Sequence, residues 1–296
     1  MQILVFGAGA VGSLIGGLLA RTHAVTLVGR DSHMRVCEAN GLDIRGEITE
    51  HQTLSGTTTQ TGHEADIALI TVKTFDTMDA CTALNSCEID TVCSLQNGLT
   101  ESTLATELNA PVVAGTCRYG ALQPRPGVVK CTGQGKTVFG GYTERAGAAA
   151  ECVHRAFREA GIHSSIADDI RTQQWEKLAI NAGMNATTAL ARVKNGVLAN
   201  GTGNELAQAV TAEAVTVAQA VGVDLSLSDV THELDTTITQ TAANRSSMLV
   251  DVSNDGPTEV DAINGAIVQH AAEHDIDAPR NETLWRLLTL WERNHH

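Results

Sequence analysis

Three polar residues recur at intervals of four in a stretch that otherwise has the pattern of a buried helix. Lys177, Asn181 and Asn185 lie within residues 172–192. Because an α-helix repeats every ~3.6 residues, this spacing stacks one cation and two amides on one face, one turn above another. Asparagine is a poor helix former, so two of them on one face favour oriented hydrogen bonds to a ligand over ordinary contact with water.

Lys177 has apolar residues around it in the sequence, among them Trp175, Leu178 and Ala179. Partial desolvation of a lysine lowers its pKa toward the working pH, and a lysine in that state can donate a proton in catalysis. The sequence therefore marks Lys177 as a candidate proton donor. A solvated face of an amphipathic helix is the alternative interpretation of the same pattern.

A glycine-rich loop near the start of the chain indicates a nucleotide-binding element. Residues 2–6 form a short β-rich run, and a helical pattern extends to Ala20. Between them the sequence follows the pattern GxGxxG, with Gly7, Ala8, Gly9, Ala10, Val11 and Gly12. The first glycine permits a tight turn, the second lets the backbone approach a pyrophosphate, and the third allows close packing of helix on strand. We expect phosphates at the helix N-terminus, where free N–H groups and the helix dipole favour anions; a packing turn is the alternative.

The second expected strand, residues 24–29, leads directly into Arg30. An acidic residue at this point would accept a hydrogen bond from the ribose 2′-OH of NAD, whereas an arginine can pair with the 2′-phosphate of NADP. Arg30 therefore favours NADPH over NADH. The neighbouring Asp31 weakens this preference, although Asp31 and Ser32 can instead cap the helix that follows.

Further strands are expected at residues 67–72, 91–95 and 112–116, alternating with helices. This alternation predicts an α/β fold with a doubly wound sheet. Lys73 and Asn97 directly follow two of these strands. Ligands of open α/β sheets bind beyond the carboxyl ends of the strands, so we expect cofactor and substrate near these two residues. An ordinary turn is the alternative for Asn97.

The chain changes character near residue 167. Residues 117–145 hold short β runs, expected as antiparallel additions at the sheet edge, before a helix at 146–160 and a last strand at 162–166. Only helices are expected after that, at 169–192, 203–221, 226–251, 258–274 and 280–293. We therefore predict an NADP-binding Rossmann-type domain over residues 1–167 and an all-helical substrate domain over residues 168–296.

The helical half holds two more groups of polar residues. Asn244 and Ser247 lie three residues apart in the helix expected at 226–251. Thr258 is typical of an N-cap for the next helix, which places Glu259 in its first turn. A carboxylate that interacts with the helix dipole is the local interpretation of Glu259.

Composition excludes several classes of function. A formal net charge of −14 argues against a nucleic-acid partner, which would require a basic face. No run of about 18 apolar residues predicts a membrane span. The seven cysteines include no CxxC pair, which predicts reduced thiols in a cytoplasmic protein and no metal site. Because only five residues are lysine, we also consider a protein adapted to concentrated salt; an acidic enzyme of no special habitat is the alternative.

Taken in order, these motifs resemble those of the ketopantoate reductases, also called 2-dehydropantoate 2-reductases, over nearly the whole chain. The resemblance is carried by GAGAVG at 7–12, Arg30, Lys73, QNG at 96–98, GT at 115–116, WEKLAIN at 175–181, NATTAL at 185–190, NG at 195–196, SSML at 246–249 and TEVDAINGAIV at 258–268. The chain departs from the family at Ala186, where proline is frequent, and at Gly256-Pro257, where a basic residue is frequent.

The resemblance implies NADPH-dependent reduction of the C2 ketone of 2-dehydropantoate to D-pantoate, a step toward pantothenate and coenzyme A. Lys177 would donate a proton to the developing alkoxide while the nicotinamide delivers a hydride to C2. The implied substrate contacts are Asn97, Lys177, Asn181, Asn185, Asn195, Asn244 and Ser247. The implied cofactor contacts are Gly7 to Gly12, Arg30, Lys73, Asn97, Ala121 and Glu259. Glu259 could also hold Lys177 in place.

Two other functions are compatible with this organisation. A β-hydroxyacid dehydrogenase, or a reductase of another 2-keto acid, would share a Rossmann-type domain and a helical domain with a catalytic lysine. A non-catalytic NADPH sensor would lack Lys177 or Glu259, and both are present. The expected partner is a small 2-keto acid; a homodimer is one expectation, since the sequence alone does not give the oligomeric state.

Overall fold

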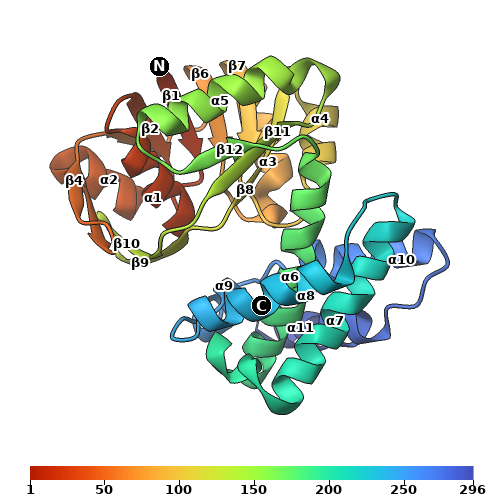
Figure 1. Ribbon diagram of the computed structural model, residues 1–296. Helices are drawn as coiled ribbons and strands as arrows, with labels where there is room; N and C mark the ends of the chain where they lie inside the picture. Colours follow the sequence, from red (N-terminus) through yellow and green to blue (C-terminus); the bar gives the residue numbers. More distant parts are fainter. Residues whose placement is uncertain (296) are drawn as a thin grey trace. The chain divides into compact units, whose positions relative to one another are not determined.

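Residues 1–295 are described by a computed structural model, and they fall into two units (Figure 1). The first unit comprises residues 1–96 and 100–170, and the second comprises residues 97–99 and the chain from Arg171 onward. Asn97 therefore groups with the helical part of the chain, although it follows a strand of the sheet. The assignment of cofactor binding to one part and substrate binding to the other stays a prediction.

The first unit is built on an eight-stranded sheet in the order β12-β11-β8-β7-β6-β1-β2-β5. Its strands are β1 (Gln2–Phe6), β2 (Ala24–Val28), β5 (Ser55–Thr57), β6 (Glu64–Ile70), β7 (Glu88–Ser94), β8 (Val112–Cys117), β11 (Thr137–Gly141) and β12 (Ser164–Ile166). All neighbouring strands are parallel except β11 and β8. The chain leaves β1 toward β2 on one side and returns to β6 on the other, so the connections switch direction beside β1.

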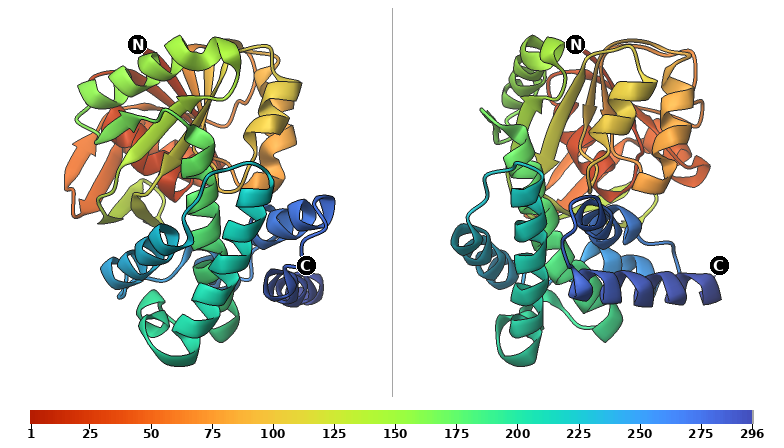
Figure 2. Two further views of the ribbon diagram at one scale, coloured as in Figure 1. Left: turned by 45° about the vertical axis from the view of Figure 1, so that its right-hand side comes forward. Right: turned by 90° about the vertical axis from the view of Figure 1, so that its right-hand side faces the viewer.

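Helices cover both faces of this sheet. They are α1 (Ala10–Leu19), α2 (Asp31–Asn40), α3 (Thr77–Leu84), α4 (Glu101–Glu107) and α5 (Gly147–Glu159), with short 3₁₀ turns η1 (Thr74–Asp76) and η2 (Glu144–Ala146). The right-hand view of Figure 2 shows α5 on one side of the strands and α3 and α4 on the other. Because side chains alternate along a strand, Ile3 and Val5 join the core that includes α1 and α5, whereas Leu4 and Phe6 join the core under α3 and α4. Burial on both faces explains the unbroken apolar sequence of the strands.

A second sheet of four strands was not predicted. It has the order β4-β3-β10-β9 and comprises β3 (Leu42–Gly46), β4 (Glu50–Gln52), β9 (Gly120–Arg125) and β10 (Val128–Gly133). The expectation that residues 117–145 extend the edge of the main sheet is therefore wrong for β9 and β10. It holds for the antiparallel strand β11, although β12 lies outside it.

The second unit is helical around one apolar core. Its elements are α6 (Ile170–Ala191), η3 (Asn195–Ala199), α7 (Gly201–Ala220), α8 (Leu227–Gln240), α9 (Ser247–Ser253), η4 (Asp261–Gly265), α10 (Ala266–Glu273) and α11 (Pro279–His295). No helix within residues 1–295 is both long and apolar enough to cross a membrane. The predicted fold class, a Rossmann-type doubly wound sheet followed by an all-helical part, is confirmed.

One predicted helix, at 226–251, is wrong because the chain breaks after Gln240. A turn follows, and α9 begins only after Ser246, whose hydroxyl accepts a hydrogen bond from the Leu249 N–H at 3.1 Å. Asn244 therefore lies in a loop and Ser247 in the first turn of the next helix, and the two do not share a helix.

The predicted helix caps also differ from the structure at two places. The N-cap of α2 is Arg30, and Asp31 lies in the first turn, where its carboxylate accepts from Arg35 at 2.8 Å. Thr258 accepts from the Val260 N–H at 3.2 Å, which forms a short turn ahead of η4. Element η4 is a π-helical turn, a form that is frequent at functional sites.

Candidate functional site

The three glycines of the loop after β1 have three different physical roles. Gly7 has a φ of +115°, and a Cβ on it would lie 2.5 Å from the Val72 nitrogen. A Cβ on Gly12 would overlap the Gly7 carbonyl oxygen. A Cβ on Gly9 would meet nothing within 4 Å. The first and third glycines are thus explained by the turn and by helix packing, whereas the second leaves open space beside the loop, as a close ligand requires.

This loop is held firmly by the strands around it. The N–H groups of Gly7 and Ala8 both donate to the Val28 carbonyl, at 3.0 and 2.9 Å. The Thr71 hydroxyl donates to the Gly7 carbonyl at 2.8 Å. Helix α1 starts at Ala10, with no side-chain cap and no acidic residue in its first turn. Its positive end is therefore not neutralised locally and suits a phosphate.

Two other predicted cofactor residues lie next to this loop. Lys73, which is partly buried, directly follows Val72, the residue that Gly7 approaches. Ala121 lies on β9, and Gln123 of the same strand donates to the Ala8 carbonyl at 3.3 Å. The first unit thus brings together three segments that are far apart in the sequence and that were predicted to contact one ligand.

Arg30 lies exposed at the start of α2. Within residues 1–295 its guanidinium makes no hydrogen bond or ion pair. Burial and the Asp79 charge raise the pKa of Asp76, and the Arg30 charge opposes that rise. Asp31 is already engaged by Arg35. Arg30 is therefore available to an anionic ligand, and the neighbouring Asp31 does not occupy it.

In the second unit, α6 carries Lys177, Asn181 and Asn185, which together form the predicted polar stripe. Lys177 and Asn181 are partly exposed and Asn185 is buried. Trp175, on the same helix, lies in the apolar core. The helix itself is confirmed, while the roles of its polar residues stay predictions.

Asn97 and Glu259 are joined by a direct contact that the sequence did not predict. The Asn97 side-chain amide donates to Glu259 Oε2 at 2.9 Å, across 162 positions of sequence. Gly98 has a φ of +74°, and a Cβ on it would lie 2.7 Å from the Ala262 carbonyl oxygen. The Glu259 side chain is only 5% exposed, so its carboxylate depends on protein partners rather than on water. Glu259 is thus more than a helix-dipole carboxylate, because it fixes the amide of a second predicted site residue.

Asn195, a predicted substrate contact, also makes hydrogen bonds within the protein. Its backbone N–H donates to the Asn244 carbonyl at 3.1 Å, and its side-chain amide donates to the Thr241 hydroxyl at 2.9 Å. Its Oδ1 is buried and has no hydrogen-bond partner among residues 1–295. Asn244 is partly exposed and Ser247 is exposed.

Sequence reasoning missed the role of Ser246. Its hydroxyl lies 2.7 Å from that of Thr188 on α6 and also caps α9. The signal was present, because a serine three residues before Leu249 is a typical helix cap. Through this pair the loop that carries Asn244 is attached to the helix that carries the polar stripe.

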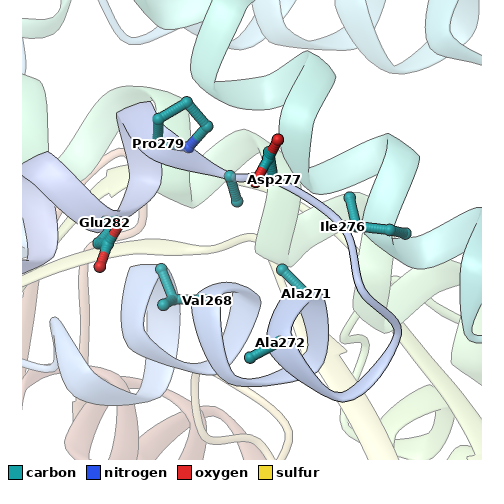
Figure 3. A pocket seen from close by; sticks show the side chains of 8 residues that line it. Val268, Ala271, Ala272, Ile276, Asp277, Pro279 and Glu282 are labelled. Atoms are coloured by element: carbon teal, nitrogen blue, oxygen red, sulfur yellow. The ribbon is translucent and has the colours of Figure 1, made fainter.

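A pocket of about 180 Å³ lies between α10 and the start of α11 (Figure 3). Its walls are largely apolar, with carboxylates from Asp277 and Glu282. No predicted site residue lines it. Two carboxylates would repel an anionic substrate, so this pocket is not the candidate site.

The chain has the architecture of proteins that join a Rossmann-type sheet to an all-helical part. It combines a doubly wound sheet, a glycine loop that suits a phosphate and a helical unit. Residues 3–144 match the family described as "Ketopantoate reductase PanE/ApbA", and residues 169–292 match its C-terminal family. The chain therefore belongs to the ketopantoate reductase family. The predicted resemblance and the assignment to the oxidoreductases are confirmed.

Relatives of similar length support this membership. The chain is 37% identical to the 2-dehydropantoate 2-reductase of Halobacterium salinarum, covering 99% of this chain and 100% of the relative. Identity with that of Pyrococcus horikoshii is 34%, covering 99% and 98%. A crystal structure of a PanE/ApbA family ketopantoate reductase from Ralstonia eutropha aligns with a TM-score of 0.90 at 31% identity, covering 100% and 99%. A D-mandelate dehydrogenase with NADH aligns with a TM-score of 0.92 at 21% identity, covering 100% and 99%, which shows the shared fold alone.

Proposed function

We propose that this protein reduces the C2 ketone of 2-dehydropantoate to the hydroxyl of D-pantoate, with NADPH as the electron donor. The observation that carries the proposal is the polar stripe of Lys177, Asn181 and Asn185 on a single helix. Full-length relatives at 34% and 37% identity bear the name of this reaction. The reaction is the reduction of a carbonyl to a CH–OH group.

The residues of the first unit fit a dinucleotide of the NADP type. The open space at Gly9 and the uncapped start of α1 suit a pyrophosphate. The exposed Arg30 guanidinium suits a 2′-phosphate, to which it can donate two parallel hydrogen bonds. Lys73 and Ala121 belong to segments at the same loop and are proposed as further contacts. When bound, the nicotinamide supplies the hydride.

Lys177 is proposed as the proton donor. As the C2 carbonyl is reduced, negative charge develops on its oxygen, and an ammonium group at that oxygen stabilises the transition state more than the ground state. Proton transfer from Lys177 Nζ then completes the hydroxyl. Asn181 and Asn185, one and two turns further along the helix, are proposed to donate to the substrate's carboxylate or hydroxyl oxygens.

The contact between Asn97 and Glu259 supports a positioning role for the carboxylate. Because Glu259 accepts from the Asn97 side-chain nitrogen, the orientation of the amide is set and its oxygen is left as an acceptor. We propose that Asn97 contacts substrate and cofactor in this orientation. Asn195, Asn244 and Ser247 are proposed as the remaining substrate contacts.

The place of the protein in metabolism follows from the proposed product. D-Pantoate leads toward pantothenate and coenzyme A. All seven cysteines are free thiols, which agrees with a reducing compartment and supports a cytoplasmic location. A homodimer stays a prediction.

The proposal is tested by identifying a product rather than by cofactor turnover alone. Purified protein and NADPH would be given equal amounts of 2-dehydropantoate, an unbranched 2-keto acid and a small semialdehyde. We expect D-pantoate as the main product, identified by chiral chromatography and mass. Preferential reduction of the semialdehyde would instead indicate a β-hydroxyacid dehydrogenase. NADPH binding without any reduction would indicate a sensor.

A further inference from the structure

A buried histidine in the first unit connects three segments that meet at the glycine loop. His33, near the start of α2, is 4% exposed. The Gly127 N–H, in the turn between β9 and β10, donates to His33 Nδ1 at 2.9 Å. On the other side of the ring, Nε2 lies 2.9 Å from the Ser13 hydroxyl of α1. That hydroxyl in turn donates to the Ala8 carbonyl at 3.2 Å.

These contacts fix the protonation state of the imidazole. Nδ1 accepts from a backbone N–H, so it carries no proton. The single hydroxyl hydrogen of Ser13 is used on the Ala8 carbonyl, so the Ser13 oxygen must accept from a proton on Nε2. His33 is therefore neutral, with its hydrogen on Nε2. Hydrogen bonds run in one direction from Gly127 through His33 and Ser13 to Ala8.

The end of this chain, the Ala8 carbonyl, lies within the loop proposed to bind phosphate. It is engaged by Ser13 and by the Gln123 amide at 3.3 Å, while the next N–H, of Gly9, donates to the Gly7 carbonyl at 2.7 Å. A carbonyl oxygen turned toward the open space at Gly9 would repel a phosphate. Its two donors keep the oxygen directed at the protein, which leaves the helix N-terminus as the group that faces an anion.

We propose that His33 is a positioning residue for the cofactor, which acts through Ser13 to hold the Ala8 carbonyl away from the phosphate site. This inference rests on the proposed function, because it assumes that the loop binds the dinucleotide. His33 also belongs to the turn that carries Arg30, whose carbonyl accepts from the His33 N–H at 3.1 Å. One imidazole thus connects the loop for the pyrophosphate with the residue for the 2′-phosphate.

A positioning role of this kind makes cofactor affinity depend on the charge of one imidazole. A proton on Nδ1 would face the Gly127 N–H, so the imidazolium is incompatible with this turn. The groups that contact the ring from α1, α2 and the β9–β10 turn are the Ser13 hydroxyl, the Cys37 thiol at 3.7 Å and the Gly127 N–H. None of them carries a charge, since burial raises the pKa of Cys37 to about 11. Burial also lowers the pKa of His33, so the neutral form is the one present near pH 7.

The experiment compares Ser13→Ala, His33→Gln and a matched control by direct titration with NADH and NADPH. The control is His154→Gln, which removes another imidazole of the first unit that pairs with a serine, Ser164, at 2.9 Å. Loss of one oriented hydrogen bond predicts a Kd about three- to tenfold higher for Ser13→Ala and His33→Gln. The control should keep the wild-type Kd.

The pH profile separates positioning from mere loss of packing. NADH is the better probe here, since the 2′-phosphate of NADPH itself titrates near pH ~6. Because burial lowers the pKa of His33, we expect the wild-type Kd for NADH to stay constant near neutral pH and to rise only as the pH falls below the ordinary imidazole pKa of about 6.5, and the His33→Gln profile to be flat. If His33→Gln fails to fold in a thermal unfolding scan, Ser13→Ala, which only removes an oxygen, carries the test.

Two results would overturn the proposal, and they differ from each other. Folded Ser13→Ala with wild-type affinity at every pH would show that the chain from His33 to Ala8 does not position the loop. A wild-type protein that binds neither NADH nor NADPH would overturn the proposed function, and this inference with it. Binding by the wild type with weakened, pH-insensitive binding by His33→Gln supports both.

Discussion

At the scale of single residues, the proposed chemistry depends on Lys177. It is one of five lysines in the chain and the only one in the polar stripe of α6. Replacing it by alanine removes the proposed proton donor and, with it, the charge proposed to stabilise the developing alkoxide. We expect Lys177→Ala to lower kcat by a factor of about 10²–10⁴.

Direct titration with NADPH distinguishes lost chemistry from lost binding in that variant. The Kd for NADPH should stay at the wild-type value, because the proposed cofactor loop lies in the other unit. Lys130→Ala, an exposed lysine on β10, is the matched control and should keep the wild-type kcat. Unchanged turnover in Lys177→Ala would remove this residue from the mechanism.

The proposed preference for NADPH over NADH also depends on a single residue. Arg30 is exposed, and within residues 1–295 its guanidinium makes no hydrogen bond. A charge-assisted hydrogen bond contributes about 1.5–3 kcal/mol, so Arg30→Ala should raise the KM for NADPH about ten- to hundredfold. The KM for NADH, which has no 2′-phosphate, serves as the internal control and should change little. An equal loss for both cofactors would show that Arg30 does not contact the 2′-phosphate.

At the scale of elements, two glycines of the loop between β1 and α1 are expected to affect different properties. Gly12 should affect the stability of the fold, and Gly9 should affect cofactor binding. A methyl group on Gly12 would overlap the Gly7 carbonyl, whereas one on Gly9 meets no protein atom, and the Gly9 φ of −79° suits any residue. We expect Gly12→Ala to lower the free energy of unfolding by about 1–3 kcal/mol. Gly9→Ala should fold with wild-type stability and bind NADPH more weakly.

Denaturant unfolding and NADPH titration of the two variants check this prediction. If Gly9→Ala binds NADPH as tightly as the wild type, the open space at this position is not a ligand site. If Gly12→Ala is as stable as the wild type, α1 can move away from the loop at little cost.

The sequence predicted an element well where the contacts that determine it join residues close in the sequence. The strand, glycine loop and first helix were predicted almost to the residue, because turn and packing there depend on neighbours in sequence. The helix expected at 226–251 breaks because the N–H groups of Gly196 and Asn195 bind the carbonyls of Ala242 and Asn244, at 3.1 Å each. Residues 240–246 contain no glycine or proline that would predict this break.

In the candidate site, too, local contacts were predicted and distant ones were not. The stripe on α6 follows from helical spacing within one segment. The contact between Asn97 and Glu259 joins residues 162 positions apart, and no periodicity relates them. The network of Ser13, His33 and Gly127 depends on the position of β9 and β10, which form a sheet with β3 and β4 that was not predicted.

At the scale of the whole molecule, net charge governs the response to salt. The sequence holds 34 acidic and 20 basic residues. Because acidic residues outnumber basic ones, the negative charges repel one another. Exposed ion pairs such as Asp31 with Arg35 contribute little to stability and do not offset this repulsion. Salt screens such repulsion over a Debye length of about 3 Å at 1 M. We expect the protein to unfold when molar KCl is removed, and the midpoint of thermal unfolding to rise with KCl over the concentrations at which the protein is folded.

Sucrose in place of KCl is the control, because it is also excluded from protein surfaces but does not screen charge. Equal stabilisation by sucrose would attribute the effect to exclusion rather than to charge. Stability that does not change with salt would contradict adaptation to concentrated salt.

The proposed function is tested most directly by the rate of NADPH oxidation, followed at 340 nm, with purified protein and 2-dehydropantoate. The assay is repeated with NADH and at low and molar KCl, so that an unfolded protein is not mistaken for an inactive one. We predict rapid oxidation that requires 2-dehydropantoate and prefers NADPH to NADH. No oxidation at any salt concentration, in a folded protein that binds NADPH, would contradict the proposed reaction.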